Sequence, residues 1–199
     1  MGGVGYAGRA RMGAAKRKDG SMNGISAVEH LRSLIREVPD FPKAGISFKD
    51  FTPLLADPAA LALAVELMAN PFRGKGIELV IGAESRGFIF GTAIAQALSA
   101  GFVPIRKPGK LPRSVHGVDY ALEYGTDRLE IHSDALVGTP KVLIVDDLLA
   151  TGGTMKASCE LVGMTDATIA GVAVLIELGY LSGRKQLAGV ETVHAVLQY

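Results

Sequence analysis

The sequence has 199 residues, of which 48% are apolar and 21% are charged, and its formal net charge is +1. This length fits one globular domain, and the composition is too apolar for an intrinsically disordered chain. No apolar run approaches the roughly 20 residues that a membrane-spanning helix needs, so we expect no membrane association. The single cysteine, Cys159, cannot form a disulfide within the chain and indicates a reducing compartment.

The first 24 residues differ from the rest of the chain. They are rich in glycine, lack apolar periodicity and carry enough basic side chains to leave the remaining residues mildly acidic. Such a segment buries too little apolar surface to offset its chain entropy. An arm for nucleic acid, an organelle address and a true start at Met12 or Met22 stay open as alternatives. We interpret residues 1–24 as a disordered basic extension without a catalytic role, and residues 25–199 as one folded domain.

Helices are predicted where apolar residues recur every three or four positions. Ser26 can cap a helix whose apolar positions continue to Val38, just before Pro39. Residues 41–50 are interrupted by proline and glycine, which predicts a loop. Further helices are expected at residues 58–70, 87–98 and 153–162.

Strands alternate with these helices along the chain. Apolar runs predict strands at residues 78–82, 102–106, 141–146, 170–176 and 191–197, and two alternating runs at 118–124 and 128–132 predict a hairpin. Continuously apolar strands between helices are typical of a parallel sheet that is covered on both faces. We therefore expect an α/β fold with a central, mostly parallel sheet flanked by helices. Ligands of such sheets bind beyond the carboxyl ends of the strands, which selects the loops after Gly82, Arg106, Val145 and Ile176.

The loop after Val145 has the clearest chemical pattern. A buried strand ends in two adjacent carboxylates, Asp146 and Asp147, and the chain then turns into a helix through Ala150, Thr151, Gly152, Gly153 and Thr154. The glycines allow close approach of the backbone, and main-chain amides, threonine hydroxyls and the helix start form a cradle for a phosphate monoester. The carboxylates would repel a phosphate, but they accept hydrogen bonds from sugar hydroxyls or hold a hydrated metal ion. A ribose 5-phosphate satisfies both halves of this pattern.

Residues 142–154 resemble the signature with which type I phosphoribosyltransferases bind phosphoribosyl pyrophosphate (PRPP). Residues 41–50, 84–91, 106–112 and 122–125 resemble segments of the adenine-specific members of that family, in the same order, so the resemblance covers about residues 25–199. It implies a phosphoribosyltransferase domain with a mobile hood loop and hairpin, here around residues 108–121. It also implies Mg²⁺-dependent transfer of the 5-phosphoribosyl group from PRPP to adenine, which yields AMP and pyrophosphate, in a cytoplasmic homodimer. The Mg²⁺ would be held mainly by PRPP and water, with no direct protein ligand.

The resemblance also implies which residues hold each part of the substrates. Ile46, Ser47 and Phe48 are expected to bind the purine base on one side and Leu178 on the other. Glu84, Ser85 and Arg86 are expected to bind pyrophosphate, and the resemblance implies a cis peptide bond at Glu84–Ser85. The same stretch is similar to the nucleophile elbow of serine hydrolases, but Ala83 stands in place of the first glycine of that motif.

A basic loop and an acidic residue complete the predicted site. Arg106, Lys107 and Lys110 would clamp the pyrophosphate, and the first two would lie near the dimer contact. Glu123, next to Tyr124, would take the proton that adenine N9 loses, so we assign catalytic roles to Glu123, Asp146 and Asp147.

One position departs from the family pattern, and two other kinds of function would share part of it. Lys49 stands where many relatives have arginine, and lysine lacks the planar fork of a guanidinium. A PRPP-sensing regulator, or an enzyme for xanthine, hypoxanthine or orotate, would share the loop after Val145. We expect no nucleic-acid binding because residues 25–199 are net acidic.

Overall fold

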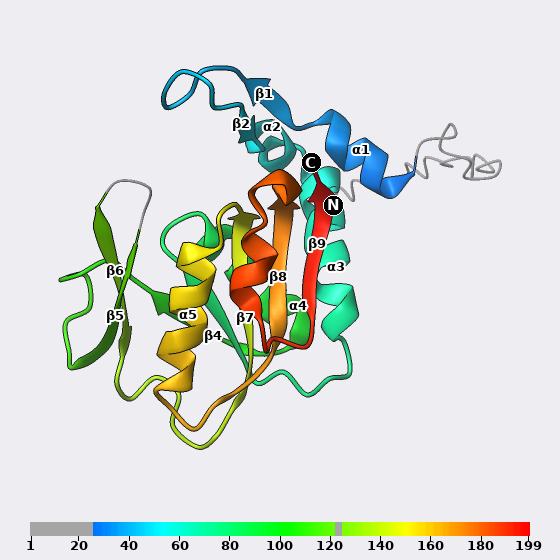
Figure 1. Ribbon diagram of the computed structural model, residues 1–199. Helices are drawn as coiled ribbons and strands as arrows, with labels where there is room; N and C mark the ends of the chain where they lie inside the picture. The colour runs from blue at the N-terminus through cyan, green and yellow to red at the C-terminus, as the bar shows by residue number, and fades with distance from the viewer. Residues whose placement is uncertain (1–25, 122–124) are drawn as a thin grey trace, which may run out of the picture.

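A computed structural model describes residues 26–121 and 125–199 (Figure 1). Its centre is a five-stranded sheet with the order β4-β3-β7-β8-β9, in which every pairing is parallel. The strands are β3 (Leu79–Ala83), β4 (Gly101–Ile105), β7 (Lys141–Leu149), β8 (Thr168–Glu177) and β9 (Val193–Gln198). The predicted α/β fold with a parallel sheet is confirmed.

Helices cover both faces of this sheet. The helices α3 (Pro58–Ala69) and α4 (Gly87–Leu98) lie on one face, and α5 (Gly153–Gly163) lies on the other. Successive residues of β7 belong to two cores: Leu143 and Val145 pack in the core that includes α3 and α4, and Val142 and Ile144 pack in the core that includes α5. Because both faces of β7 are buried, its sequence is continuously apolar from Val142 to Val145.

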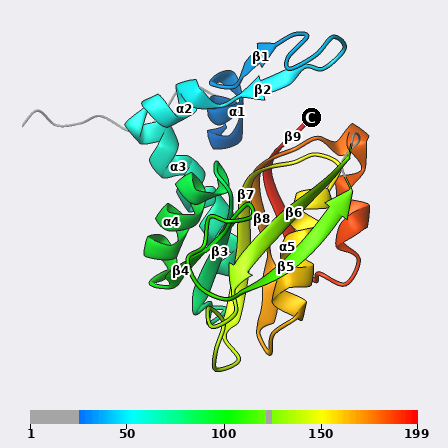
Figure 2. The same ribbon diagram turned by 90° about the vertical axis from the view of Figure 1, so that its left-hand side faces the viewer.

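A small unit lies beyond the carboxyl ends of the strands. It consists of α1 (Ala27–Ser33), β1 (Arg36–Val38), β2 (Phe48–Asp50) and α2 (Thr52–Ala56), as Figure 2 shows. The predicted first helix was wrong at its end, since residues 36–38 leave the helix and pair with residues 48–50 as an antiparallel strand. For the same reason residues 41–50 form a loop only as far as Ser47. We refer to residues 36–50 as the β1–β2 hairpin.

A second hairpin, β5 (Val115–Ala121) and β6 (Thr126–His132), stands beside the sheet over α5 (Figure 2). The predicted hairpin is present, with strands that begin at Val115 and Thr126, and residues 122–124 of that prediction lie outside the described residues. An isolated bridge between Arg106 and Glu130 joins the hairpin to the segment after β4. Short 3₁₀ turns that the sequence analysis did not predict complete the fold: η1 (Asn70–Phe72), η2 (Gly179–Leu181) and η3 (Gly183–Leu187). Within the described ranges, none of the helices has the length and apolar character to cross a bilayer. The prediction for residues 1–24 lies outside the described residues.

Candidate active site

A cavity of about 510 Å³ opens at the carboxyl end of β7. The structure brings together here most of the residues predicted to bind PRPP, because the loops after β3 and β7 lie side by side. Its lining includes Glu84, Ser85, Arg86, Asp146, Asp147, Ala150, Thr151, Gly152, Gly153 and Thr154. The peptide bond between Glu84 and Ser85 is cis.

The loop from Ala150 to Thr154 needs a glycine at position 152. Gly152 has a φ of +89°, and a Cβ there would lie 2.5 Å from the main-chain oxygen of Gly183. A Cβ on Gly183 would in turn lie 2.1 Å from the oxygen of Ala150, so the loop and η3 pack backbone against backbone. The helix α5 begins at Gly153, and its first main-chain N–H groups have no partner within the helix. They border the cavity and favour an anion there.

Two buried carboxylates also line this cavity. Asp146 and Asp147 are 8% and 4% exposed, and the Asp147 amide donates to Asp146 Oδ1 over 2.9 Å. Arg86 Nε lies 2.6 Å from Asp147 Oδ2, so a single guanidinium compensates the pair. Burial, together with the negative charge of Asp147, raises the pKa of Asp146 well above its ordinary value. The charged form of Asp146 therefore costs stability in the folded protein.

Replacing Asp146 with asparagine is expected to raise the melting temperature at pH 7. The folded state holds a proton on Asp146 more tightly than the unfolded state does, so this group's contribution to stability is full at low pH and is lost as the pH rises through the raised pKa. The asparagine variant avoids that loss. In a protein of this size, its melting temperature is expected to rise by about 2–4 °C for each kcal/mol of unfolding free energy that is recovered. Thermal unfolding of both proteins between pH 5 and 8 checks this: a gain that grows as the pH falls would contradict it.

A second cavity of about 570 Å³ adjoins the first. Its lining includes Ile46, Ser47 and Phe48 of the β1–β2 hairpin and Leu178 of the segment after β8. The two cavities share Arg86, Asp147, Leu148, Ala150 and Thr151, so a ligand can extend from one into the other. We call this second cavity the base cleft.

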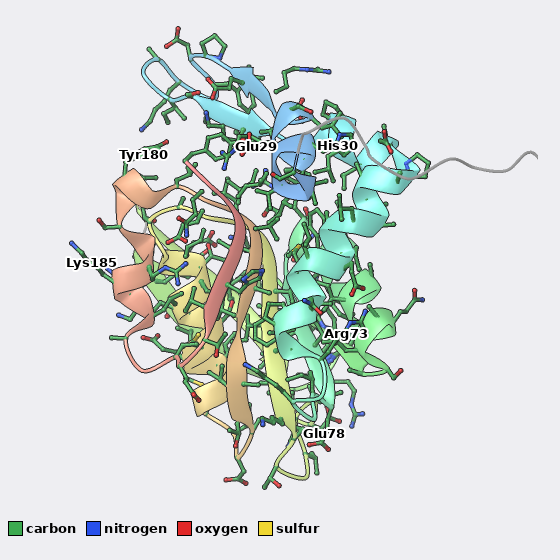
Figure 3. The ribbon with its side chains drawn as sticks, turned by 90° about the vertical axis from the view of Figure 1, so that its right-hand side faces the viewer. Glu29, His30, Arg73, Glu78, Tyr180 and Lys185 are labelled. Carbon is green, nitrogen blue, oxygen red and sulfur yellow. The ribbon has the colours of Figure 1, made fainter. Side chains whose placement is uncertain are left out.

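Aromatic contacts shape the wall of the base cleft. The Phe48 ring packs edge-on against Phe41, with 5.2 Å between the centroids, and the Arg86 guanidinium lies 5.8 Å from the Phe48 ring. Tyr180 and Leu181 line the rim although the sequence analysis missed them; Figure 3 shows Tyr180 in the turn after β8, on the side of the β1–β2 hairpin. The sequence does contain a signal for them: both are large apolar residues that closely follow the predicted end of a strand. Residues at that place are not expected in the core, so they indicate a binding surface.

Two of the predicted pyrophosphate cations, Arg106 and Lys107, do not line either cavity and are paired with carboxylates. Arg106 Nε and the Lys107 amide both donate to Glu84 Oε2, over 2.9 and 2.7 Å. Burial alone would raise the pKa of Glu84, but these bonds lower it. The Lys107 ammonium donates to Asp127 and, over 3.2 Å, to the Tyr120 hydroxyl.

Three other predicted residues either do not line the cavities or lie outside the described residues. Lys110 does not line either cavity, although its charge helps to lower the pKa of Glu84. Glu123 and Tyr124 lie outside the described residues. Burial raises the pKa of the Cys159 thiol to about 11, which keeps it protonated at neutral pH.

The fold and the paired cavities define an α/β protein that can hold a sugar phosphate in one cavity and a flat apolar group in the other. The family described as "Phosphoribosyl transferase domain" matches residues 52–190. A curated adenine phosphoribosyltransferase from Methylococcus capsulatus is 55% identical over 172 residues, which is 86% of this chain and 100% of that protein. The chain therefore belongs to the phosphoribosyltransferase family, and its relatives from Methylococcus capsulatus and Francisella tularensis are adenine phosphoribosyltransferases.

Solved structures agree with this placement. The adenine phosphoribosyltransferase of Rhodothermus marinus is 51% identical, with a TM-score of 0.83 over 87% of this chain and 98% of that one. The enzyme of Saccharomyces cerevisiae, solved with an iminoaltritol bisphosphate and adenine, is 36% identical, with a TM-score of 0.81 over 86% of this chain and 98% of that one.

Proposed function

We propose that this protein is an adenine phosphoribosyltransferase that transfers the 5-phosphoribosyl group from PRPP to adenine and releases AMP and pyrophosphate, a purine-salvage reaction. The observation that carries this proposal is the connection between the two cavities. A phosphate cradle and two carboxylates open directly into a cleft with an aromatic wall, so a sugar phosphate and a base can meet at their shared boundary. The naming of relatives at about 55% identity supports the same base.

PRPP occupies the cavity beyond β7 in this proposal. Its 5-phosphate accepts hydrogen bonds from the main-chain amides of residues 151–154, and its ribose hydroxyls donate to Asp146 and Asp147. Since Arg86 is paired with Asp147 here, hydroxyl binding releases the guanidinium, which then neutralises the pyrophosphate beside Ser85. In this exchange the ribose hydroxyls hydrogen-bond the buried carboxylates in place of the guanidinium.

Adenine lies between Phe48 and Leu178, with N9 directed at the shared boundary of the cavities. The bond from C1 of the ribose to pyrophosphate breaks as N9 bonds to C1, and charge develops on the sugar and the departing anion. The N9 proton passes to the carboxylate of Glu123, next to Tyr124. Arg106, Lys107 and Lys110 receive the pyrophosphate when the hood closes, which requires Arg106 and Lys107 to leave Glu84 and Asp127.

Magnesium fits this site as part of the substrate. In the part of the chain that the structure describes, no group of three or more histidine, cysteine or acidic side chains could hold a metal ion. Mg²⁺ keeps several waters and binds readily to phosphate oxygens, so PRPP itself supplies most of its ligands. Asp146 and Asp147 would contact it through water, and the ion would neutralise charge on the pyrophosphate.

The proposal extends to the state of the protein in the cell. Residues 25–199 form the catalytic domain of a cytoplasmic homodimer, and residues 1–24 take no part in the reaction. The single cysteine suits a reducing compartment.

A panel of bases tests the proposed function. The protein is incubated with PRPP, Mg²⁺ and one of adenine, hypoxanthine, xanthine or orotate, and release of pyrophosphate and formation of the nucleotide are measured. We expect AMP from adenine at a rate far above those of the other bases. A preference for hypoxanthine would overturn the choice of base, and no turnover with any base would refute the enzymatic activity in favour of a PRPP-binding regulator.

Replacing Phe48 with alanine tests the base cleft. Stacking of a base on an aromatic side chain contributes about 1–3 kcal/mol, so the KM for adenine is expected to rise by about 5- to 150-fold. The KM for PRPP serves as the internal reference, because Phe48 lines the base cleft and not the PRPP cavity. An equal rise of both KM values would contradict the placement of the base.

A further inference from the structure

The ring of Tyr199, which follows β9, contacts two cations from separate parts of the chain. The Arg32 guanidinium of α1 lies 4.8 Å from the ring centroid, and the Lys49 ammonium of β2 lies 4.6 Å from it. Cations are attracted to aromatic faces, more strongly where water is excluded. Lys49 is only 8% exposed. The ring therefore ties the small unit above the sheet to the end of β9, which Figure 1 shows next to α1.

Both cations are held in place by other partners. Arg32 also donates to the main-chain oxygen of Gln198 over 3.0 Å and pairs with Glu29 at 3.4 Å. Lys49 pairs with Glu37, the residue opposite it in the β1–β2 hairpin. Because each cation has an acidic partner, the two positive charges can lie at one ring without a net repulsive cost.

The backbone of Tyr199 reaches the other wall of the base cleft. Its N–H donates to the oxygen of Glu177 over 3.0 Å, and its oxygen accepts from the Gly179 N–H over 2.8 Å. These two bonds flank Leu178, which lines the base cleft from the segment after β8, whereas Phe48 lines it from β2. Through its ring, Tyr199 contacts Lys49, the neighbour of Phe48. One residue thus bridges the two walls between which the base is proposed to lie.

We propose that Tyr199 is a positioning residue for the base: it fixes the distance between Phe48 and Leu178 and thereby sets the affinity for adenine. This inference rests on the proposed function. The PRPP cavity is fixed by different contacts, namely the packing of Gly152 against Gly183 and of Gly87 against Asp146. Removing the contacts of the Tyr199 ring therefore weakens adenine binding and leaves PRPP binding unchanged.

The experiment compares Tyr199→Leu with Tyr199→Phe and the wild-type protein in steady-state assays of AMP formation. Leucine removes the aromatic face but keeps an apolar side chain, so the KM for adenine is expected to rise by about 3- to 30-fold. The KM for PRPP and kcat are expected to stay within about twofold of wild type. Phenylalanine keeps the face that meets both cations, so its KM for adenine is expected to match wild type.

Circular dichroism and melting temperature establish that each variant is folded. Should Tyr199→Leu fail to fold, Arg32→Gln removes one of the two cations from a partly exposed helix position, and the same rise confined to the adenine KM is expected. An unchanged adenine KM, or equal changes in both KM values, would overturn the inference and leave the proposed function intact. Failure of the wild-type protein to form AMP would refute the proposed function and this inference with it.

Discussion

Replacing Asp147 with alanine is expected to lower kcat/KM for PRPP by about 100-fold or more. Asp147 is 4% exposed, lines both cavities and is paired with Arg86 at 2.6 Å. Each hydrogen bond from a sugar hydroxyl to a carboxylate is worth about 1.5–3 kcal/mol, and alanine removes the acceptor. Steady-state kinetics with varied PRPP at saturating adenine measures the effect.

The matched control is Asp166→Ala. Asp166 is an exposed aspartate in the turn between α5 and β8, at the opposite end of the sheet from the cavities. We expect its kcat/KM to stay within about twofold of wild type, as for most surface substitutions. If Asp147→Ala behaved like this control, the assignment of the ribose hydroxyls to that carboxylate would be wrong.

Replacing Gly152 with alanine is expected to abolish most PRPP binding. The added Cβ would lie 2.5 Å from a backbone oxygen, that of Gly183, and alanine resists a φ of +89°. A strained residue of this kind costs about 1–3 kcal/mol even without the clash, so the loop must move and its amides lose their common direction. Calorimetric titration with PRPP and Mg²⁺ is expected to show affinity reduced by about 10- to 100-fold or more.

Gly163→Ala is the control for this substitution. Gly163 ends the same helix, α5, and a Cβ there meets nothing within 4 Å. Alanine at that position is expected to leave PRPP affinity unchanged and to keep or slightly raise the melting temperature. Equal loss of affinity in both variants would indicate a general effect on α5 and would contradict a specific role for the loop.

The parts of the fold that could be predicted are those whose sequence reflects burial directly. Strand β7 is apolar on both faces, and apolar residues recur at helical spacing in α3, α4 and α5. Apolar strands that alternate with such helices predict a parallel sheet. Strand β1 could not be predicted, because residues 36–38 continue the helical spacing of α1. Their structure is decided by pairing with residues 48–50, a tertiary contact that local spacing does not contain.

The site shows the same division. The phosphate cradle and its neighbouring carboxylates could be predicted because all of them lie within residues 146–154. The partners of the cations could not be predicted from the sequence. Arg106 pairs with Glu84, and Lys107 pairs with Asp127, through contacts between separate segments of the chain. Likewise, the contact of Tyr199 with Lys49 joins residues far apart in the sequence.

The most direct test of the central claim is a crystal structure of the protein with AMP bound. The phosphate is expected within hydrogen-bond distance of the main-chain amides of residues 151–154, with the ribose hydroxyls at Asp146 and Asp147 and adenine between Phe48 and Leu178. A phosphate held instead by Arg106 and Lys107, with the base outside the cleft, would contradict the account.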